Sequence, residues 1–210
     1  MMTSSRYTLA VVAFGLTTPV RAPAQKPPSY TAADVRFMQG MIGHHAQALA
    51  MTALIPNRTS RQDIRMLGQR IEVSQKDEIA MMQQWLRDRH QQIPSRDAQP
   101  GGQAMAGHST NMPGMAMSDT LMPGMLTSDQ LAELAKANGD EFAKLFLADM
   151  IRHHEGALVM VRSLLGTTGS GQEAEVFRFA SEVDSDQRAE IARMNALLDT
   201  LNAAGAKTHQ

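Results

Sequence analysis

Apolar residues recur every three or four positions along four long stretches of the chain, and this spacing places them on one face of an α-helix. The pattern predicts long helices over residues 31–54, 60–90, 140–165 and 172–203, and a short helix over residues 127–139. No stretch alternates apolar and polar residues as a half-buried strand does. The pattern therefore predicts an all-α fold.

Polar residues with capping chemistry mark several helix ends. Thr31 and Asp34 have the spacing of a capping box, as do Thr127 and Gln130. Pro56 with Asn57 is expected to end the first helix, because proline cannot continue a helix without losing a hydrogen bond.

Two of the long helices carry similar segments, "FMQGMIGHHAQALAM" at residues 37–51 and "FLADMIRHHEGALVM" at residues 146–160. Each contains a pair of adjacent histidines. The similarity continues into the helix that follows each of them, as "QKDEIAMM" from Gln75 and "QRAEIARM" from Gln187. The repeat predicts two duplicated helical hairpins, residues 25–92 and 127–204, whose apolar faces close one four-helix bundle.

The histidine pairs fall on or beside the expected buried faces. At 100° per residue the buried arcs of the two repeated helices contain Phe37, Met41, His44, His45, Ala48, Met51, Ile55 and Phe146, Met150, His153, His154, Ala157, Met160, Leu164. In the partner helices, Gln75 with Glu78 and Gln187 with Glu190 interrupt apolar seams. A buried carboxylate is costly unless it is paired or bound. Glu78 and Glu190 are therefore interpreted either as metal ligands or as acceptors that fix which imidazole nitrogen faces a metal.

Methionine beside histidine suggests a soft-metal site. Met41 with His45, and Met150 with His154, stand four residues apart and are neighbours on a helix surface. Residues 93–126 form an expected linker rich in Pro, Gly and Met, whose methionines have no core to join. The candidate metal ligands are Met41, His44, His45, Met51, Met150, His153, His154, Met160, His108, Met112, Met115, Met117, Met122 and Met125. The alternatives are packing roles for the helical methionines and metal-free His–Glu hydrogen bonds that fix helix register.

The composition narrows the choice of metal ion and of cellular compartment. The chain has 17 methionines, no cysteine and a formal net charge of −1, with no basic cluster that would favour a nucleic-acid partner. Thioethers select Cu(I), and they persist in oxidising compartments where thiols form disulfides. Residues 1–24 have the pattern of a signal peptide, with an apolar core at 9–16 and "APA" at 22–24. The expected location is periplasmic or secreted, without a membrane span after cleavage, and residues 205–210 form a tail.

The two histidine motifs resemble those of the exported CopM-like copper-binding proteins, a family first catalogued as a domain of unknown function. The shared pattern, F-x-x-x-M-I-x-H-H-x-x-A-x-x-M followed by Q-x-x-E-I-x-x-M, occurs twice, and "MPGMLTSDQLAEL" at 122–134 is also similar. The resemblance covers residues 31–201. It implies a ferritin-like bundle that binds copper through Met and His side chains in the periplasm, in copper tolerance or delivery.

Three functions follow from the sequence. The first is a non-catalytic protein that sequesters copper or exchanges it with a periplasmic partner, holding Cu(I) through Met and His and Cu(II) through His and carboxylate. The second is a ferritin-like di-metal oxidoreductase, which is disfavoured because no histidine has a glutamate three positions before it. The third is a pH-responsive structural or interaction bundle. The apolar arcs can close within one chain or across a dimer.

Overall fold

The computed structural model describes residues 29–94 and 121–207, and within these ranges the regular structure is entirely helical. The helices are α1 (Ala32–Thr52), α2 (Ile55–Arg58), α3 (Gln62–Asp88), α4 (Ser128–Lys136), α5 (Gly139–Gly166) and α6 (Ala174–Lys207). The predicted all-α class is confirmed. None of these helices is long and apolar enough to cross a membrane.

The predicted helix starts are confirmed at two capping boxes, whereas one predicted end was wrong. Thr31 Oγ1 accepts from the Asp34 amide at 3.2 Å, and the Asp34 carboxylate accepts from the Thr31 amide at 2.7 Å. Thr127 and Gln130 form the same reciprocal pair at the start of α4. Pro56 does not end the first helix. Helix α1 has already ended at Thr52, and Pro56 lies in the first turn of α2, where the missing N–H leaves no helical hydrogen bond unmade.

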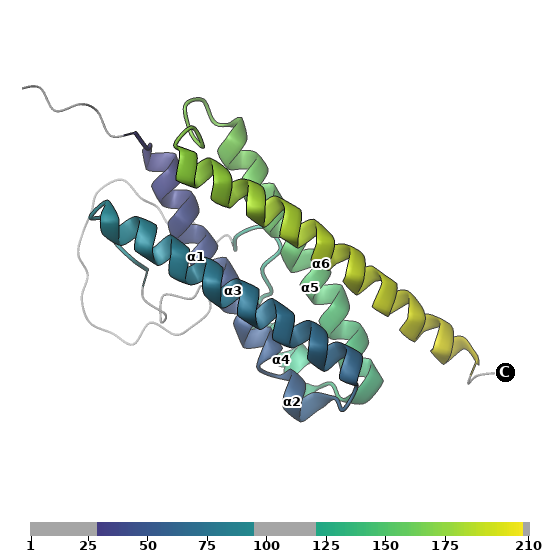
Figure 1. Cartoon of the computed structure of the whole chain (residues 1–210). Helices are drawn as coiled ribbons and strands as arrows, with labels where there is room; N and C mark the ends of the chain where they lie inside the picture. Colours follow the sequence, from purple (N-terminus) through teal and green to yellow (C-terminus); the bar gives the residue numbers. More distant parts are fainter. Residues whose placement is uncertain (1–28, 95–120, 208–210) are drawn as a thin grey trace, which may run out of the picture.

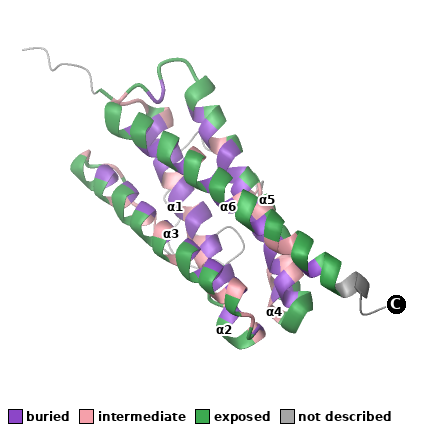
Figure 2. Ribbon diagram, turned by 45° about the vertical axis from the view of Figure 1, so that its right-hand side comes forward, coloured by how far each residue is buried: buried purple, intermediate pink, exposed green. Residues whose placement is uncertain are grey.

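The long helices form two hairpins that meet side by side. Helix α1 packs against α3, α5 packs against α6, and the hairpins contact each other mainly through α1 and α5 (Figure 1). Buried residues lie in stripes along the facing sides of the helices, while the outer faces are exposed (Figure 2). The amphipathic pattern of the sequence therefore positions each helix with its apolar stripe inward.

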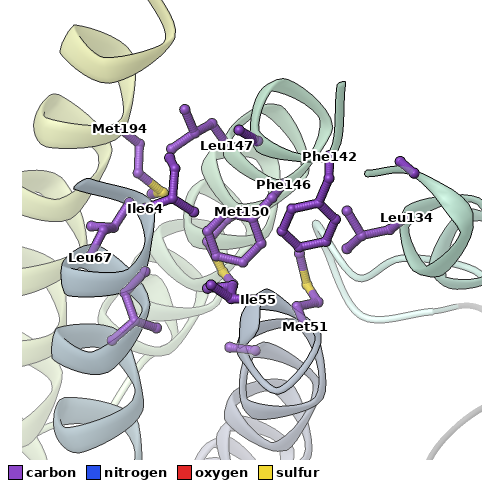
Figure 3. Close-up of a cluster of buried hydrophobic side chains, with 14 of the residues drawn as sticks. Met51, Ile55, Ile64, Leu67, Leu134, Phe142, Phe146, Leu147, Met150 and Met194 are labelled. Carbon is purple, nitrogen blue, oxygen red and sulfur yellow. The ribbon is translucent and has the colours of Figure 1, made fainter. Parts of the chain in front are cut away.

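Two apolar clusters fill the ends of the helical assembly. The Phe146 cluster contains Met51, Ile55, Ile64, Leu67, Leu134, Phe142, Phe146, Leu147, Met150 and Met194 (Figure 3). Its rings Phe142 and Phe146 are stacked with centroids 5.8 Å apart. The Trp85 cluster contains Phe37, Met38, Met41, Ile42, Met82, Trp85, Leu86, Val161 and Phe179. Along each long helix, the two clusters are separated by a short stretch in which the buried side chains are polar.

The expected linker 93–126 needs a correction at its C-terminal end. Residues 121–126 pack against α1, and Met125 and Leu126 are buried in the core. The Gln47 side chain donates to the Leu126 carbonyl at 2.9 Å and accepts from the Leu126 amide at 2.7 Å. The expectation that these methionines have no core to join was therefore wrong for Met125. Apolar periodicity missed the packing because a segment of six residues is too short to show a period.

Asp34 connects the start of α1 to the loop between α5 and α6. Its buried carboxylate accepts from Thr31 and from the Gly171 amide, the latter at 2.7 Å. We expect Asp34→Ala to lower the free energy of unfolding by about 2 kcal/mol, because it leaves buried donors unsatisfied. Urea denaturation of Asp34→Ala beside Asp129→Ala, an exposed acid in the first turn of α4, measures the effect. Equal losses in the two variants would contradict it.

Candidate metal centre

A layer of buried polar side chains separates the two apolar clusters. We call it the polar belt, and each long helix contributes two of its residues: His44 and His45 from α1, Gln75 and Glu78 from α3, His153 and His154 from α5, and Gln187 and Glu190 from α6. None of the eight is more than 6% exposed. The predicted burial of both histidine pairs and of the interrupting carboxylates is confirmed.

Two histidine–glutamate pairs form the outer parts of the belt. His154 Nε2 donates to Glu190 Oε2 at 2.6 Å, and His45 Nε2 makes the equivalent bond to Glu78. Ser74 Oγ also donates to the Glu78 carboxylate, at 3.0 Å. With the proton on Nε2, the Nδ1 atom of each ring carries a lone pair. Both Nδ1 atoms are buried and have no hydrogen-bond partner among the described residues.

His44 and His153 form the centre of the belt. Their ring centroids are 3.9 Å apart and the rings are inclined by 39°. The His44 and His45 centroids are 6.4 Å apart, and those of His153 and His154 are 6.2 Å apart, so the four rings form a row. His44 Nε2 donates to the Pro123 carbonyl at 3.0 Å. In the described part of the chain, His44 Nδ1 and His153 Nε2 have no partner.

The central rings are held neutral by their surroundings. The pKa of His44 is lowered to about 3, first by burial and then by the neighbouring His45, while the hydrogen bond to the Pro123 carbonyl opposes the shift. Burial, followed by the repulsion that a proton on both His44 and His153 would cause, lowers the pKa of His153 well below its usual value. Neutral imidazole is the form that binds metal ions, so both central rings are ready to act as ligands at pH 7.

The belt carboxylates of α3 and α6 help to raise the pKa of one exposed acid, Asp186. The pKa of Asp186 is raised, first by partial burial and then by the negative charges of Glu78 and Glu190. Asp186 therefore lies within electrostatic reach of both belt carboxylates. In the repeat Asp186 corresponds to Ser74, so the two halves of the belt differ at this position.

The predicted methionine ligands are distributed over several environments. Met51 and Met150 lie in the Phe146 cluster (Figure 3), and Met41 lies in the Trp85 cluster. Met122 and Met160 are partly buried near Gly40 of α1. His108, Met112, Met115 and Met117 lie outside the described residues. The described residues include no group of three His, Asp or Glu side chains arranged to hold an ion as they stand.

The sequence did not reveal three groups that connect the belt to residues 121–126. They are the Pro123 carbonyl, which bonds to His44, and Gln47 and Gly156, which contact the same segment. A backbone carbonyl has no residue-type signature, so His44 could not be assigned its acceptor. A signal did exist in the repeat, because Gln47 of the first copy is replaced by Gly156 in the second, inside otherwise similar segments. Both residues contact the 121–126 segment.

The fold agrees with comparisons to known proteins. The family described as "Domain of unknown function (DUF305)" matches residues 34–198, which include both hairpins and the whole polar belt. The chain belongs to the DUF305 family. The predicted resemblance to CopM-like proteins is confirmed, because solved structures of CopM are among its structural neighbours. A search of curated proteins gives no match.

Other DUF305 structures are more similar to this chain. A DUF305 fragment from Deinococcus radiodurans is 28% identical, with a TM-score of 0.66 over 82% of this chain and 99% of that chain. A DUF305 protein from Streptomyces coelicolor, described as secreted, is 26% identical, with a TM-score of 0.63 over 81% of this chain and 94% of that chain. CopM in its Cu(II)-bound form is 24% identical, with a TM-score of 0.56 over 80% of this chain and 96% of that chain, and shares the fold.

Proposed function

We propose that this protein binds copper ions as cargo in the polar belt, without catalysis, and sequesters them or passes them to a partner protein. The observation that carries the proposal is the set of four imidazole nitrogens, one on each belt histidine, that are buried without a partner in the described residues. Each such atom costs roughly 1–3 kcal/mol when left unsatisfied. Binding of a metal ion removes that cost, because a metal ion accepts the lone pair of each nitrogen.

The chemistry of the belt fits copper. Imidazole suits copper in both oxidation states, and thioethers favour Cu(I). Glu78 and Glu190 each hold one histidine by Nε2 and direct the opposite nitrogen inward, an arrangement that fixes ligand orientation in metal sites. CopM, which shares the fold, has structures with Cu(I) and with Cu(II) bound. These observations support copper as the ion and the histidines as its principal ligands.

We also propose that the two hairpins form a duplicated four-helix bundle of ferritin-like type that works outside the cytoplasm. Support comes from the repeated pairs His45–Glu78 and His154–Glu190, which occupy matching positions of the two hairpins. The Streptomyces coelicolor relative is described as secreted, in line with the signal-peptide pattern. A di-metal oxidoreductase is less well supported, because the belt holds only two carboxylates and each already pairs with an imidazole.

Removal of all four belt histidines tests the proposal. We expect the variant with His44, His45, His153 and His154 changed to Ala to lose most of the Cu(I) capacity of the wild-type chain. Competition with a chromogenic Cu(I) chelator measures the loss, and circular dichroism checks that the helices are retained. His90→Asn is the matched control, because His90 is exposed, lies outside the belt and has a positive φ that Asn tolerates. Unchanged stoichiometry in the quadruple variant would overturn the proposal.

A further inference from the structure

Residues 121–126, here called the strap, cross the α1–α5 layer at the level of the two central histidines (Figure 1). The Pro123 carbonyl accepts from His44 Nε2, and Gln47 holds the Leu126 amide and carbonyl through two hydrogen bonds. Pro123 is exposed to solvent, while His44 behind it is completely buried. The strap therefore lies between the central histidine pair and solvent on this face of the molecule.

The strap rests on a surface of α1 and α5 that we call its seat. On the α5 side, glycines allow the closest contacts. A Cβ on Gly156 of α5 would lie 1.9 Å from the Pro123 oxygen, a distance at which the two atoms overlap. Gly124 has a φ of +76°, and a Cβ there would lie 2.4 Å from the Arg152 carbonyl oxygen. The backbone of the strap thus contacts the backbone of α5 directly, and any side chain at these two positions prevents that contact.

The opposite side of the seat lies on α1. A Cβ on Gly40 would lie 3.4 Å from the Met122 sulfur, and a Cβ on Gly43 would lie 3.5 Å from its methyl group. The Met122 side chain therefore covers the helix surface one turn before His44. Together with Gln47, these glycines form the α1 side of the contact with the strap.

The seat coincides with the positions at which the two copies of the repeat differ. Phe, Met and both histidines are the same in the two segments, but Gly40, Gly43 and Gln47 correspond to Asp149, Arg152 and Gly156. Asp149 and Arg152 instead form an ion pair of 2.8 Å on α5. Because the described residues hold a single strap beside two central histidines that match in the repeat, only one of the two rings donates to the Pro123 carbonyl.

We propose that the strap makes the two central histidines unequal: while it is docked, His44 can offer a soft metal ion only Nδ1, whereas His153 offers Nε2. His44 Nε2 becomes available only when the strap releases it, and the docked strap also slows entry of the ion to the central pair. This inference rests on the proposed copper function, and it assigns a ligand atom to each central ring and an entry face to that same site.

Substitutions in the seat test the covering role. We expect Gly156→Ala and Gln47→Ala to bind Ag(I), a redox-stable soft ion, about tenfold faster than wild type in stopped-flow competition with a chelator, with unchanged stoichiometry. Gly166→Ala is the matched glycine control, since a Cβ there meets no described atom within 4 Å, and Gln69→Ala is the exposed glutamine control. Gln47→Ala keeps the test decisive if Gly156→Ala does not fold.

Hydrogen exchange at the Leu126 amide verifies an open strap in Gly156→Ala. In Gln47→Ala, which itself removes the acceptor of the Leu126 amide, loss of protection at the Met125 amide verifies it. Wild-type uptake rates in variants with a verified open strap would overturn the covering role. For the inequality of the two rings, ¹⁵N NMR of the metal-free wild-type chain is expected to show His44 with its proton on Nε2 and Nδ1 free, and the seat variants are expected to show a mixture of both His44 tautomers. A wild-type His44 with its proton on Nδ1 would overturn the inequality. Failure of the wild-type chain to bind Ag(I) or Cu(I) would instead overturn the proposed function itself.

Discussion

Acidification from pH 7 to pH 4 is expected to remove roughly 3 kcal/mol of stability from the metal-free protein through His44 alone. The folded-state pKa of His44 is about 3, below the ordinary histidine value of 6.5, because burial disfavours the charged ring. Between these values the unfolded chain binds more protons than the folded chain, so stability falls as the pH falls. Above about pH 6.5 the ring is neutral in both states and the contribution vanishes.

His153 acts in the same direction, since burial also lowers its pKa. Domains of this size have free energies of unfolding of about 5–15 kcal/mol, so the two rings together can remove a large part of the total. Urea denaturation at pH 7, 5.5 and 4 measures the decline. The double variant with His44 and His153 changed to Gln is expected to show a flatter profile, whereas His90→Asn keeps the wild-type slope. A wild-type urea midpoint that stays constant from pH 7 to pH 4 would refute the lowered pKa values of His44 and His153.

The polar belt gathers buried polar groups that lower the stability of the fold into one layer. Partnerless imidazole nitrogens and buried carboxylates are unfavourable features of a protein core. The Phe146 and Trp85 clusters on either side supply the apolar burial that keeps such a layer folded. This separation explains how the protein can keep four unsatisfied ligand atoms at its centre: stability comes from the ends of the assembly, and the proposed binding capacity comes from the middle.

The main helices and the belt residues were predictable because both depend on periodicity. A helix buries every third or fourth residue, so His44, His45 and Glu78 could be assigned to inward faces from their positions relative to Phe37 and Ile71. The capping boxes at Thr31 and Thr127 were predictable for a similar reason, since they are local and depend on residue type. The pairing of each histidine pair with a carboxylate of the following helix followed from the hairpin connection.

Other features depend on tertiary contacts that leave no local pattern. The Pro123 carbonyl is a backbone atom, and its bond to His44 depends on how closely Gly156 lets the strap approach α5. The choice between Nδ1 and Nε2 as the free nitrogen of each ring also depends on this geometry. Helix α2 was missed because proline usually ends a helix, although it is equally suited to the first turn of a new one.

Replacement of the belt carboxylates distinguishes their two possible roles. We expect Glu190→Ala to weaken Cu(I) binding about 10–100-fold, because His154 loses the acceptor that fixes its tautomer and orientation. The same change should lower the free energy of unfolding by about 1–3 kcal/mol, since the buried Nε2–H is left unpaired. Chelator competition and urea denaturation measure the two effects. Glu182→Ala, at an exposed acid on the same helix, is the control, and its effect on stability should be within about 0.5 kcal/mol.

The Glu190→Gln variant distinguishes a carboxylate that orients His154 from one that itself binds copper. The amide oxygen of Gln can still accept from His154 Nε2, so an orienting role predicts that most of the Cu(I) affinity is retained. A carboxylate that itself ligates copper predicts that Gln weakens binding as much as Ala does. The observed bond already occupies one oxygen of Glu190 with the ring, and it leaves His154 Nδ1 as the free donor, which favours the orienting role. The same comparison at Glu78 and His45 should give the same result, because the two pairs are equivalent in the repeat.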